Sequence, residues 1–217
     1  PATARMSSVA RDFEGQSVTV MGLGSFGGGV GVVRFLHDHG ADVTISDIRP
    51  VEQLSDPLDA LPQGPRIRVH AGGHRDEDFR DAELIVVNPA VKPGHPLVES
   101  ARLRGTPITS EIGLFWRQCR GRIAAVTGTN GKSTTAALLH HLLQTEGRSA
   151  WLGGNLGGSL LTDVDRIGPD DWVVLELSSF QLVALDELQA SPQIAVVTNF
   201  APNHLDWHES LEDYRFA

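Results

Sequence analysis

Short apolar runs bounded by turn residues alternate along this chain with longer segments whose apolar residues recur at helical spacing. In the first half, the apolar runs predict strands at 17–21, 42–47, 68–70, 84–87 and 107–109. The segments between them predict helices up to about residue 39, at 95–104 and at 111–117. Gly40 is typical of a residue that ends a helix. The first 47 residues therefore predict a βαβ unit.

The second half shows the same alternation. Apolar runs predict buried parallel strands at 123–126, 150–152, 172–176 and 194–198. Helical segments are predicted at 134–146 and 180–185, and another begins near residue 211. We therefore expect two α/β domains, 1–121 and 122–217. Because the sequence stops inside a predicted helix, we expect the second domain to be truncated.

One stretch carries most of the chemical information. It reads Ile123-Ala-Ala-Val-Thr-Gly-Thr-Asn-Gly-Lys-Ser-Thr-Thr135, a strand followed by a glycine turn and a helix start. N–H groups of such a loop and first helical turn converge on one point, where they bind phosphate. Lys132 can reach the β- and γ-phosphates of a nucleotide, and the hydroxyl of Ser133 or Thr134 can hold Mg²⁺. The predicted nucleoside triphosphate loop consists of Gly128, Thr129, Asn130, Gly131, Lys132, Ser133 and Thr134.

The loop differs from the common P-loop spacing, which places a glycine where Val126 stands; it is two residues shorter. A glycine-rich turn with an incidental lysine is the alternative interpretation. We favour the nucleotide loop because strand, glycines, lysine and paired hydroxyls occur in the required order.

Polar residues also follow the predicted strands of this half. Glu176, Asn155 and His204 all fall at carboxyl ends of strands, where open α/β sheets bind ligands. Glu176 offers a hard oxygen ligand that can complete a Mg²⁺ shell beside Ser133. His204 can ligate a metal or contact the reacting phosphate. The structural alternatives are a helix-capping acid, a turn asparagine and a loop histidine without a ligand.

A second glycine pattern lies near the start of the chain. Gly22-Leu-Gly24-Ser-Phe-Gly27 follows a strand, and Asp47 ends the next one, which matches the dinucleotide fingerprint. Alone this pattern indicates NAD, but the same physics serves any nucleotide diphosphate. Arg49 adds a cation suited to a phosphate or base contact. Glycines that only permit tight strand–helix packing are the structural alternative.

Composition narrows the class of protein. A net charge of −9 argues against general nucleic-acid binding and against an anionic membrane surface. No apolar run approaches the roughly 18 residues of a membrane span, and residues 1–16 lack the apolar core of a signal peptide. The single Cys119 cannot form an internal disulfide. We expect a cytoplasmic protein.

Taken together, these motifs resemble the Mur ligases, the ATP-dependent amide-forming enzymes of peptidoglycan synthesis. The resemblance covers nearly the whole chain in order and is most specific in the ATP loop and in Leu175-Glu-Leu-Ser-Ser-Phe-Gln-Leu182. The latter resembles the member that adds D-glutamate. The motifs that carry the resemblance are 22–27, 127–134, 153–157, 175–182 and 203–206.

The resemblance implies a Rossmann-like first domain that binds the uridine diphosphate of UDP-MurNAc-L-Ala rather than NAD, followed by a P-loop ATPase-type domain. D-glutamate is the implied second substrate, and ATP and Mg²⁺ are required. Lys132 would hold ATP phosphates, Ser133 and Glu176 one Mg²⁺, and His204 a second. Asn155 would contact substrate or phosphate. The implied uridine diphosphate site comprises Gly24, Ser25, Phe26, Gly27, Asp47 and Arg49.

Several positions depart from the family pattern. Asn203 replaces an aspartate before His204, Asn88-Pro-Ala90 replaces Ser-Pro-Gly, and Phe26 stands where a polar residue is common. The family's carbamylated lysine and third domain would follow Ala217. We therefore expect this chain to fold but not to turn over substrate. We also expect it to be a monomer. The rivals are another Mur ligase, a folylpolyglutamate synthase-like ligase, an NAD-dependent oxidoreductase and a non-enzymatic UDP-binding module.

Overall fold

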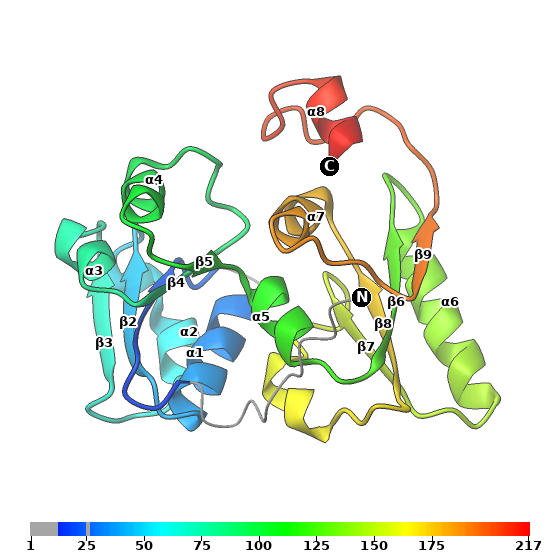
Figure 1. Ribbon diagram of the computed structural model, residues 1–217, viewed down its shortest axis with the longest axis horizontal. Coiled ribbons are helices and arrows are strands. Elements are labelled where there is room, and N and C mark those ends of the chain that lie inside the picture. The colour runs from blue at the N-terminus through cyan, green and yellow to red at the C-terminus, as the bar shows by residue number, and fades with distance from the viewer. Residues whose placement is uncertain (1–12, 25–26) are drawn as a thin grey trace. The chain divides into compact units, whose positions relative to one another are not determined.

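The computed structural model describes residues 13–24 and 27–217, which form two compact α/β units (Figure 1). The first unit takes the chain up to Asn88 together with Pro93–Thr109, and the second takes Pro89–Lys92 with Ser110–Ala217. The helix at 111–118 thus belongs to the second unit, whereas the predicted boundary lay near 121. Whether 1–121 and 122–217 are the domains of the intact protein stays a prediction.

The first unit is built on a five-stranded parallel sheet in the order β3-β2-β1-β4-β5. Its strands are β1 Ser17–Met21, β2 Asp42–Asp47, β3 Ile67–Ala71, β4 Leu84–Val87 and β5 Ile108–Thr109. Its helical segments are α1 Gly28–Asp38, η2 Val51–Gln53, α2 Ser55–Asp59, α3 Asp76–Arg80 and α4 Pro96–Leu103. The predicted βαβ unit is confirmed, and Gly40, with φ 86°, follows the end of α1 as expected.

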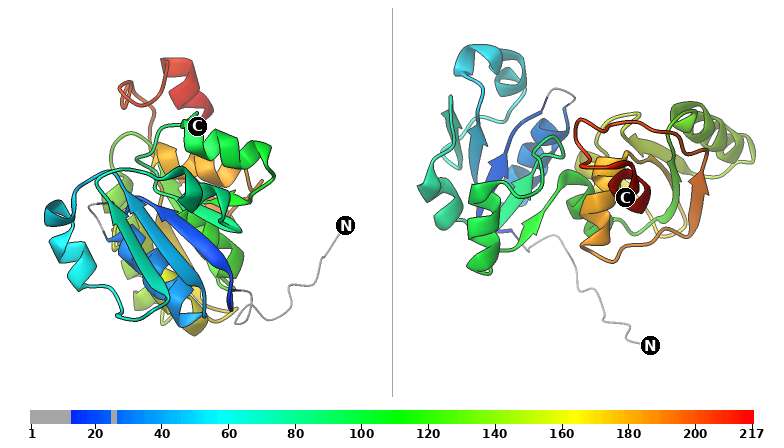
Figure 2. Two further views of the ribbon diagram at one scale, coloured as in Figure 1. Left: turned by 90° about the vertical axis from the view of Figure 1, so that its left-hand side faces the viewer. Right: turned by 90° about the horizontal axis from the view of Figure 1, so that it is seen from above.

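The second unit is built on a four-stranded parallel sheet in the order β7-β8-β6-β9. The right-hand view of Figure 2 shows β9, in orange, at one edge of this sheet. Its strands are β6 Arg122–Thr127, β7 Ala150–Gly154, β8 Trp172–Glu176 and β9 Ile194–Val197. Its helical segments are α5 Glu111–Gln118, α6 Lys132–Thr145, η3 Leu161–Arg166, α7 Ser179–Asp186 and α8 Leu211–Phe216. The helix that follows β6 packs on the sheet through Ala136, which lies against Val126 and Val174.

Strand order places the two glycine-rich loops at equivalent points. In the first sheet β1 lies between β2 and β4, and in the second sheet β6 lies between β8 and β9. The later strands of each unit therefore lie on both sides of its first strand. Such a switch in strand order opens a crevice at the carboxyl ends of the strands, and that is where open α/β sheets bind ligands. Both loops leave the sheet at such a point.

The sequence analysis missed four short helical segments, η2, α2, α3 and η3. Each is six residues or fewer, so hydrophobic periodicity has too few turns to reveal it. None of the helices within residues 13–24 and 27–217 combines the length and the apolar character needed to cross a bilayer.

Substituting Gly29 should destabilise the first unit. A Cβ at this position would lie 2.6 Å from Leu23 Cα and would overlap the Leu23 carbonyl oxygen, so backbone has to move. We expect Gly29→Ala to lower the free energy of unfolding by about 1–3 kcal/mol in urea denaturation. Gly64→Ala is the control, because its nearest neighbour, His37 Nε2, lies 3.7 Å away. Equal stability of the two variants would contradict the packing argument.

Candidate functional site

The loop between β6 and α6 is shaped by two glycines with different requirements. Gly131 adopts a left-handed conformation, φ 80°, at the start of α6, and a side chain there would meet open space. Gly128, φ 129°, has no such room, because a Cβ would overlap Thr198 Oγ1 and lie 2.9 Å from the Asn199 carbonyl oxygen. The loop therefore depends on one glycine for conformation and on the other for close approach.

Hydrogen bonds fix this loop to the end of β9. The N–H of Asn130 donates to Asn199 Oδ1 at 3.1 Å, and Asn199 Nδ2 donates back to the Asn130 carbonyl at 2.9 Å. The Thr198 hydroxyl donates to the same carbonyl at 2.6 Å. The loop is consequently held in its bent form before any ligand arrives.

Thr129 faces the protein interior. Its N–H donates to the Asn199 carbonyl at 3.0 Å, and its hydroxyl accepts from the N–H of Ala201 at 2.9 Å. The same hydroxyl lies 3.0 Å from the Tyr214 hydroxyl of α8. Because these groups are engaged within the protein, Thr129 supports the loop from behind.

The Lys132 side chain folds back onto the loop. Its ammonium donates to the carbonyls of Gly128 at 2.8 Å and Thr129 at 3.0 Å, so the positive charge lies over the loop. Gly131 offers no side chain to accept from the first turn of α6. The N–H groups of that turn are therefore available, and exposed Ser133 and Thr134 stand beside them.

Glu176 ends β8 next to this loop. It pairs with Val126 of β6 and is only 2% exposed. Its Oε1 accepts from Asn155 Nδ2 at 3.2 Å, whereas its Oε2 is buried without a hydrogen-bond partner. A buried carboxylate oxygen without a partner is costly, and a cation would relieve that cost. Glu176 therefore fits the predicted role of a Mg²⁺ ligand.

The predicted neighbour Asn155 is brought to Glu176 by the turn after β7. Gly154, φ 89°, crosses so close to the end of β8 that a Cβ would overlap the Glu176 carbonyl oxygen. The N–H of Asn155 donates to that carbonyl at 2.8 Å. The two polar residues thus meet at the carboxyl edge of the sheet, as expected from their positions at the ends of predicted strands.

His204 lies in the loop after β9. Its ring contacts the Phe180 ring of α7 at a centroid distance of 5.0 Å and has no hydrogen-bond partner among the described residues. No group of three or more His, Cys, Asp or Glu side chains in the described part of the chain is arranged to hold a metal. Protein carboxylates and imidazoles alone therefore make no cage here; hydroxyl and phosphate oxygens would have to complete one.

In the first unit, the carboxylate of Asp47 is satisfied internally. It accepts from the N–H of Leu23 at 2.9 Å, from the N–H of Arg49 at 2.9 Å, and from the Arg49 guanidinium at 2.8 and 3.0 Å. Burial is the largest effect on Asp47 and opposes ionisation, but these donors outweigh it and lower the pKa of Asp47 from its ordinary 3.8. Asp47 therefore holds the loop after β1.

Arg49 and the glycines complete this edge. The guanidinium of Arg49 also donates to the Gly24 carbonyl at 3.3 Å. A Cβ on Gly24 would lie 2.6 Å from Asn88 Nδ2, so this glycine lets the loop pass the end of β4. Gly27, φ 81°, begins α1 with open space around it. Ser25 and Phe26 lie outside the described residues.

Sequence reasoning missed the groups that support both loops. It overlooked Thr198, Asn199 and Tyr214, which contact the loop before α6, and the hydrogen bond between Ser46 Oγ and His74 Nδ1 at 2.9 Å. A signal existed for Thr198 and Asn199, since polar residues at the carboxyl end of a predicted strand fall at the ligand edge. Nothing local marked Tyr214, whose partner is 85 positions away.

Fold and site together define an α/β protein with a glycine-rich loop and a lysine before a helix, and a second glycine loop on a separate parallel sheet. A sequence model described as Mur ligase MurD-like, N-terminal domain, matches residues 16–110, and one described as Mur ligase middle domain matches residues 126–217. The chain belongs to the Mur ligase family.

Curated relatives of this chain have names that agree with this family assignment. The UDP-N-acetylmuramoylalanine--D-glutamate ligase of Roseiflexus sp. is 47% identical over 203 residues, covering 94% of this chain and 43% of the relative. The protein of the same name from Acidobacterium capsulatum is 42% identical over 204 residues, covering 94% and 43%. The chain thus spans less than half the length of these relatives.

Solved structures show the same fold. One is the UDP-N-acetylmuramate:L-alanyl-gamma-D-glutamyl-meso-diaminopimelate ligase from Neisseria meningitides, with TM-score 0.54 and 21% identity over 93% of this chain and 66% of that chain. Another is the UDP-N-acetylmuramate-alanine ligase MurC from Thermotoga maritima, with TM-score 0.53 and 25% identity over 92% and 45%.

Asp47→Asn should lower stability in a pH-dependent way. Because folding lowers the pKa of Asp47, its carboxylate stabilises the fold above about pH 3.8, and this contribution is lost as pH falls through the lowered pKa. We expect a deficit of about 1.5–3 kcal/mol at pH 7 that shrinks in acid, measured by urea unfolding. Asp42→Asn, at the other end of β2, is the control. A deficit that stays constant with pH would argue against this role.

Proposed function

We propose that this chain is the substrate-nucleotide and ATP-binding part of an ATP-dependent ligase that adds D-glutamate to UDP-MurNAc-L-Ala. The proposal rests on two neighbouring features. Lys132 places its ammonium over the loop that follows β6, and Glu176 at the end of the adjacent strand β8 has a buried Oε2 without a hydrogen-bond partner. The name shared by the two relatives above supports the choice of D-glutamate over the amino acids of other Mur ligases.

In this proposal the loop before α6 binds the phosphates of ATP in the conformation that it has in the structure. N–H groups of Gly131, Lys132 and Ser133 bind the phosphates, with the Thr134 hydroxyl nearby. The Lys132 ammonium exchanges its loop carbonyls for β- and γ-phosphate oxygens. Ser133 and Glu176 would hold one Mg²⁺, and His204 would help to hold a second. Bound Mg²⁺ supplies positive charge that neutralises the phosphates during transfer.

The proposed reaction is an activation followed by amide formation. A carboxylate oxygen of the L-alanyl group attacks the γ-phosphorus of ATP, the bond from that phosphorus to the bridging oxygen breaks, and ADP leaves. The amine of D-glutamate then attacks the acyl carbon of the acyl phosphate, phosphate departs with the bonding electrons, and the nitrogen loses a proton. Lys132, Asn155 and His204 would position and stabilise these phosphates electrostatically.

The first unit would bind the uridine diphosphate. Gly24 and Gly27 have no side chains to keep a pyrophosphate away from the backbone, and Arg49, which donates to the Gly24 carbonyl, brings a guanidinium to the same edge. An NAD-dependent oxidoreductase is disfavoured because Asp47, which would accept from the ribose, already has four donors. Folylpolyglutamate synthase-like activity leaves this unit unexplained. A cytoplasmic monomer stays a prediction.

Loss of Lys132 should weaken ATP binding. Lys132→Ala removes the charge over the loop, and we expect the Kd for ATP with Mg²⁺ to rise roughly 10- to 100-fold in calorimetric titration, as for other charged hydrogen bonds. Arg148→Ala removes an exposed cation shortly after α6 and serves as the control. Unchanged ATP affinity in Lys132→Ala would sink the assignment of the loop.

Titration with UDP-MurNAc-L-Ala and with NAD⁺ should separate the two interpretations of the first unit. We expect the uridine compound to bind and NAD⁺ to give no heat. Arg49→Ala should weaken uridine-nucleotide binding, whereas Arg80→Ala, which alters an exposed cation on α3, should not. Binding of NAD⁺ alone would overturn the ligase proposal for this unit.

A further inference from the structure

The backbone of His204 is held in an unfavourable conformation. Its φ is 54°, and among the described residues Gln189 is the only other non-glycine residue with positive φ. Such a conformation is unfavourable for a residue with a side chain, and it persists where the surroundings over-determine it. The contacts around His204 must therefore hold its backbone in place.

A tight turn closes directly on His204. Its carbonyl accepts hydrogen bonds from the N–H of Trp207 at 3.1 Å and from the N–H of His208 at 2.9 Å. The conformation of His204 is thus coupled through one turn of backbone to the position of His208.

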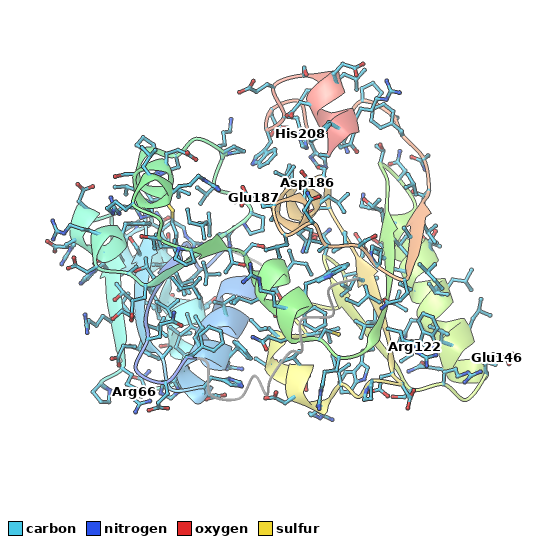
Figure 3. The ribbon with its side chains drawn as sticks, in the orientation of Figure 1. Arg66, Arg122, Glu146, Asp186, Glu187 and His208 are labelled. Atoms are coloured by element: carbon cyan, nitrogen blue, oxygen red, sulfur yellow. The ribbon has the colours of Figure 1, made fainter. Side chains whose placement is uncertain are left out.

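His208 is anchored on both sides. His208 is only 1% exposed, and Figure 3 shows it on the segment before α8, facing α7. Its Nδ1 lies 3.2 Å from Asp213 Oδ2, and its Nε2 lies 2.9 Å from the Ser179 hydroxyl. A carboxylate only accepts, so Nδ1 donates to Asp213 and, in the neutral ring, Nε2 accepts from Ser179. The ring therefore links α8 to the first residue of α7.

The order Ser–His–Asp resembles a hydrolytic triad, but its burial points to another use. Ser179 is only 8% exposed and His208 only 1% exposed, so the hydroxyl offers a substrate little access. The network instead holds chain segments together.

Aromatic packing extends the anchor to the His204 ring. The Phe180 ring stacks on the His208 ring at 5.7 Å with an interplanar angle of 18°, and meets the His204 ring at 5.0 Å with an angle of 64°. Phe180 is the second residue of α7, and Glu176, four residues earlier, is the last residue of β8. The helix that follows the Glu176 strand thus contacts the His204 ring.

We infer that His208 is a positioning residue that holds His204 in place for Mg²⁺–ATP through Ser179, Asp213 and the shared turn. The inference rests on the proposed function, since it takes His204 as a metal ligand. Groups that orient a ligand typically change metal affinity by about 10- to 100-fold when they are removed. A loss through His208 should therefore appear in the Mg²⁺ dependence of ATP binding rather than in binding of ATP itself.

The experiment uses the chain of residues 1–217 and a fluorescent ATP analogue. Affinity is measured with EDTA and across a Mg²⁺ titration for wild type, His204→Ala, His208→Ala and His208→Gln. We expect His208→Ala to raise the half-saturating Mg²⁺ concentration about 10-fold, while metal-free affinity stays within about twofold. His208→Gln retains one of the two hydrogen bonds and should fall between.

Controls separate positioning from folding. His141→Ala, an exposed histidine of α6, should match wild type, and thermal unfolding reports whether each variant is folded. Ser179→Ala should raise the Mg²⁺ requirement and add little on top of His208→Ala, because the two share one interaction. If His208→Ala does not fold, Ser179→Ala and His208→Gln carry the test.

The outcomes distinguish the inference from the proposed function. If His204→Ala leaves the Mg²⁺ requirement unchanged, the metal role of His204 in the proposed function fails and the inference fails with it. If His204→Ala raises that requirement while His208→Ala and Ser179→Ala do not, the proposed function stands and the inference is overturned. Equal losses with EDTA and with Mg²⁺ in the His208 variants would indicate general loosening of the fold, which also overturns it.

Discussion

The close approach between the glycine-rich loop before α6 and the end of β9 is the constraint on which the second unit depends. It exists because Gly128 has no side chain to collide with Thr198 and Asn199. That approach allows the loop to be bonded from behind by side chains that follow a strand. With its outer face free of these bonds, the loop can present Lys132 and the first turn of α6 to a ligand.

The two glycine loops look alike in sequence but differ in electrostatics. At the first loop, the Asp47 carboxylate is fully used by Arg49 and Leu23, so the acid supplies shape and leaves no unmet charge. At the second, Glu176 keeps a buried oxygen without a partner. A buried carboxylate oxygen without a hydrogen-bond partner is suited to bind a cation, whereas a carboxylate with all its partners is suited to hold backbone in place. Burial and hydrogen-bond partners therefore distinguish two acids that motif spacing treats alike.

The strands, the long helices and the polar residues at strand ends could be predicted from the sequence, because each depends on local periodicity or on strand order alone. Steric roles of glycines could not. Gly27 meets open space, whereas Gly29, which no motif singled out, lies against the Leu23 backbone. Thr129 belongs to the predicted phosphate loop yet points inward to Tyr214. Such roles depend on contacts between distant segments, which a linear pattern does not encode.

The N-termini of α6 and α7 differ in a way that favours phosphate binding at α6 and not at α7. Both α6 and α7 begin near the carboxyl edge of the same sheet, and either could attract an anion. The start of α7 is closed by a capping box, in which the Ser178 hydroxyl accepts from the N–H of Gln181 and the Gln181 side chain accepts from the N–H of Ser178. The start of α6 has Gly131 as its cap and no such closure. Its free N–H groups are thus the ones that a phosphate can satisfy, while α7 serves as a rigid base for His204 and His208.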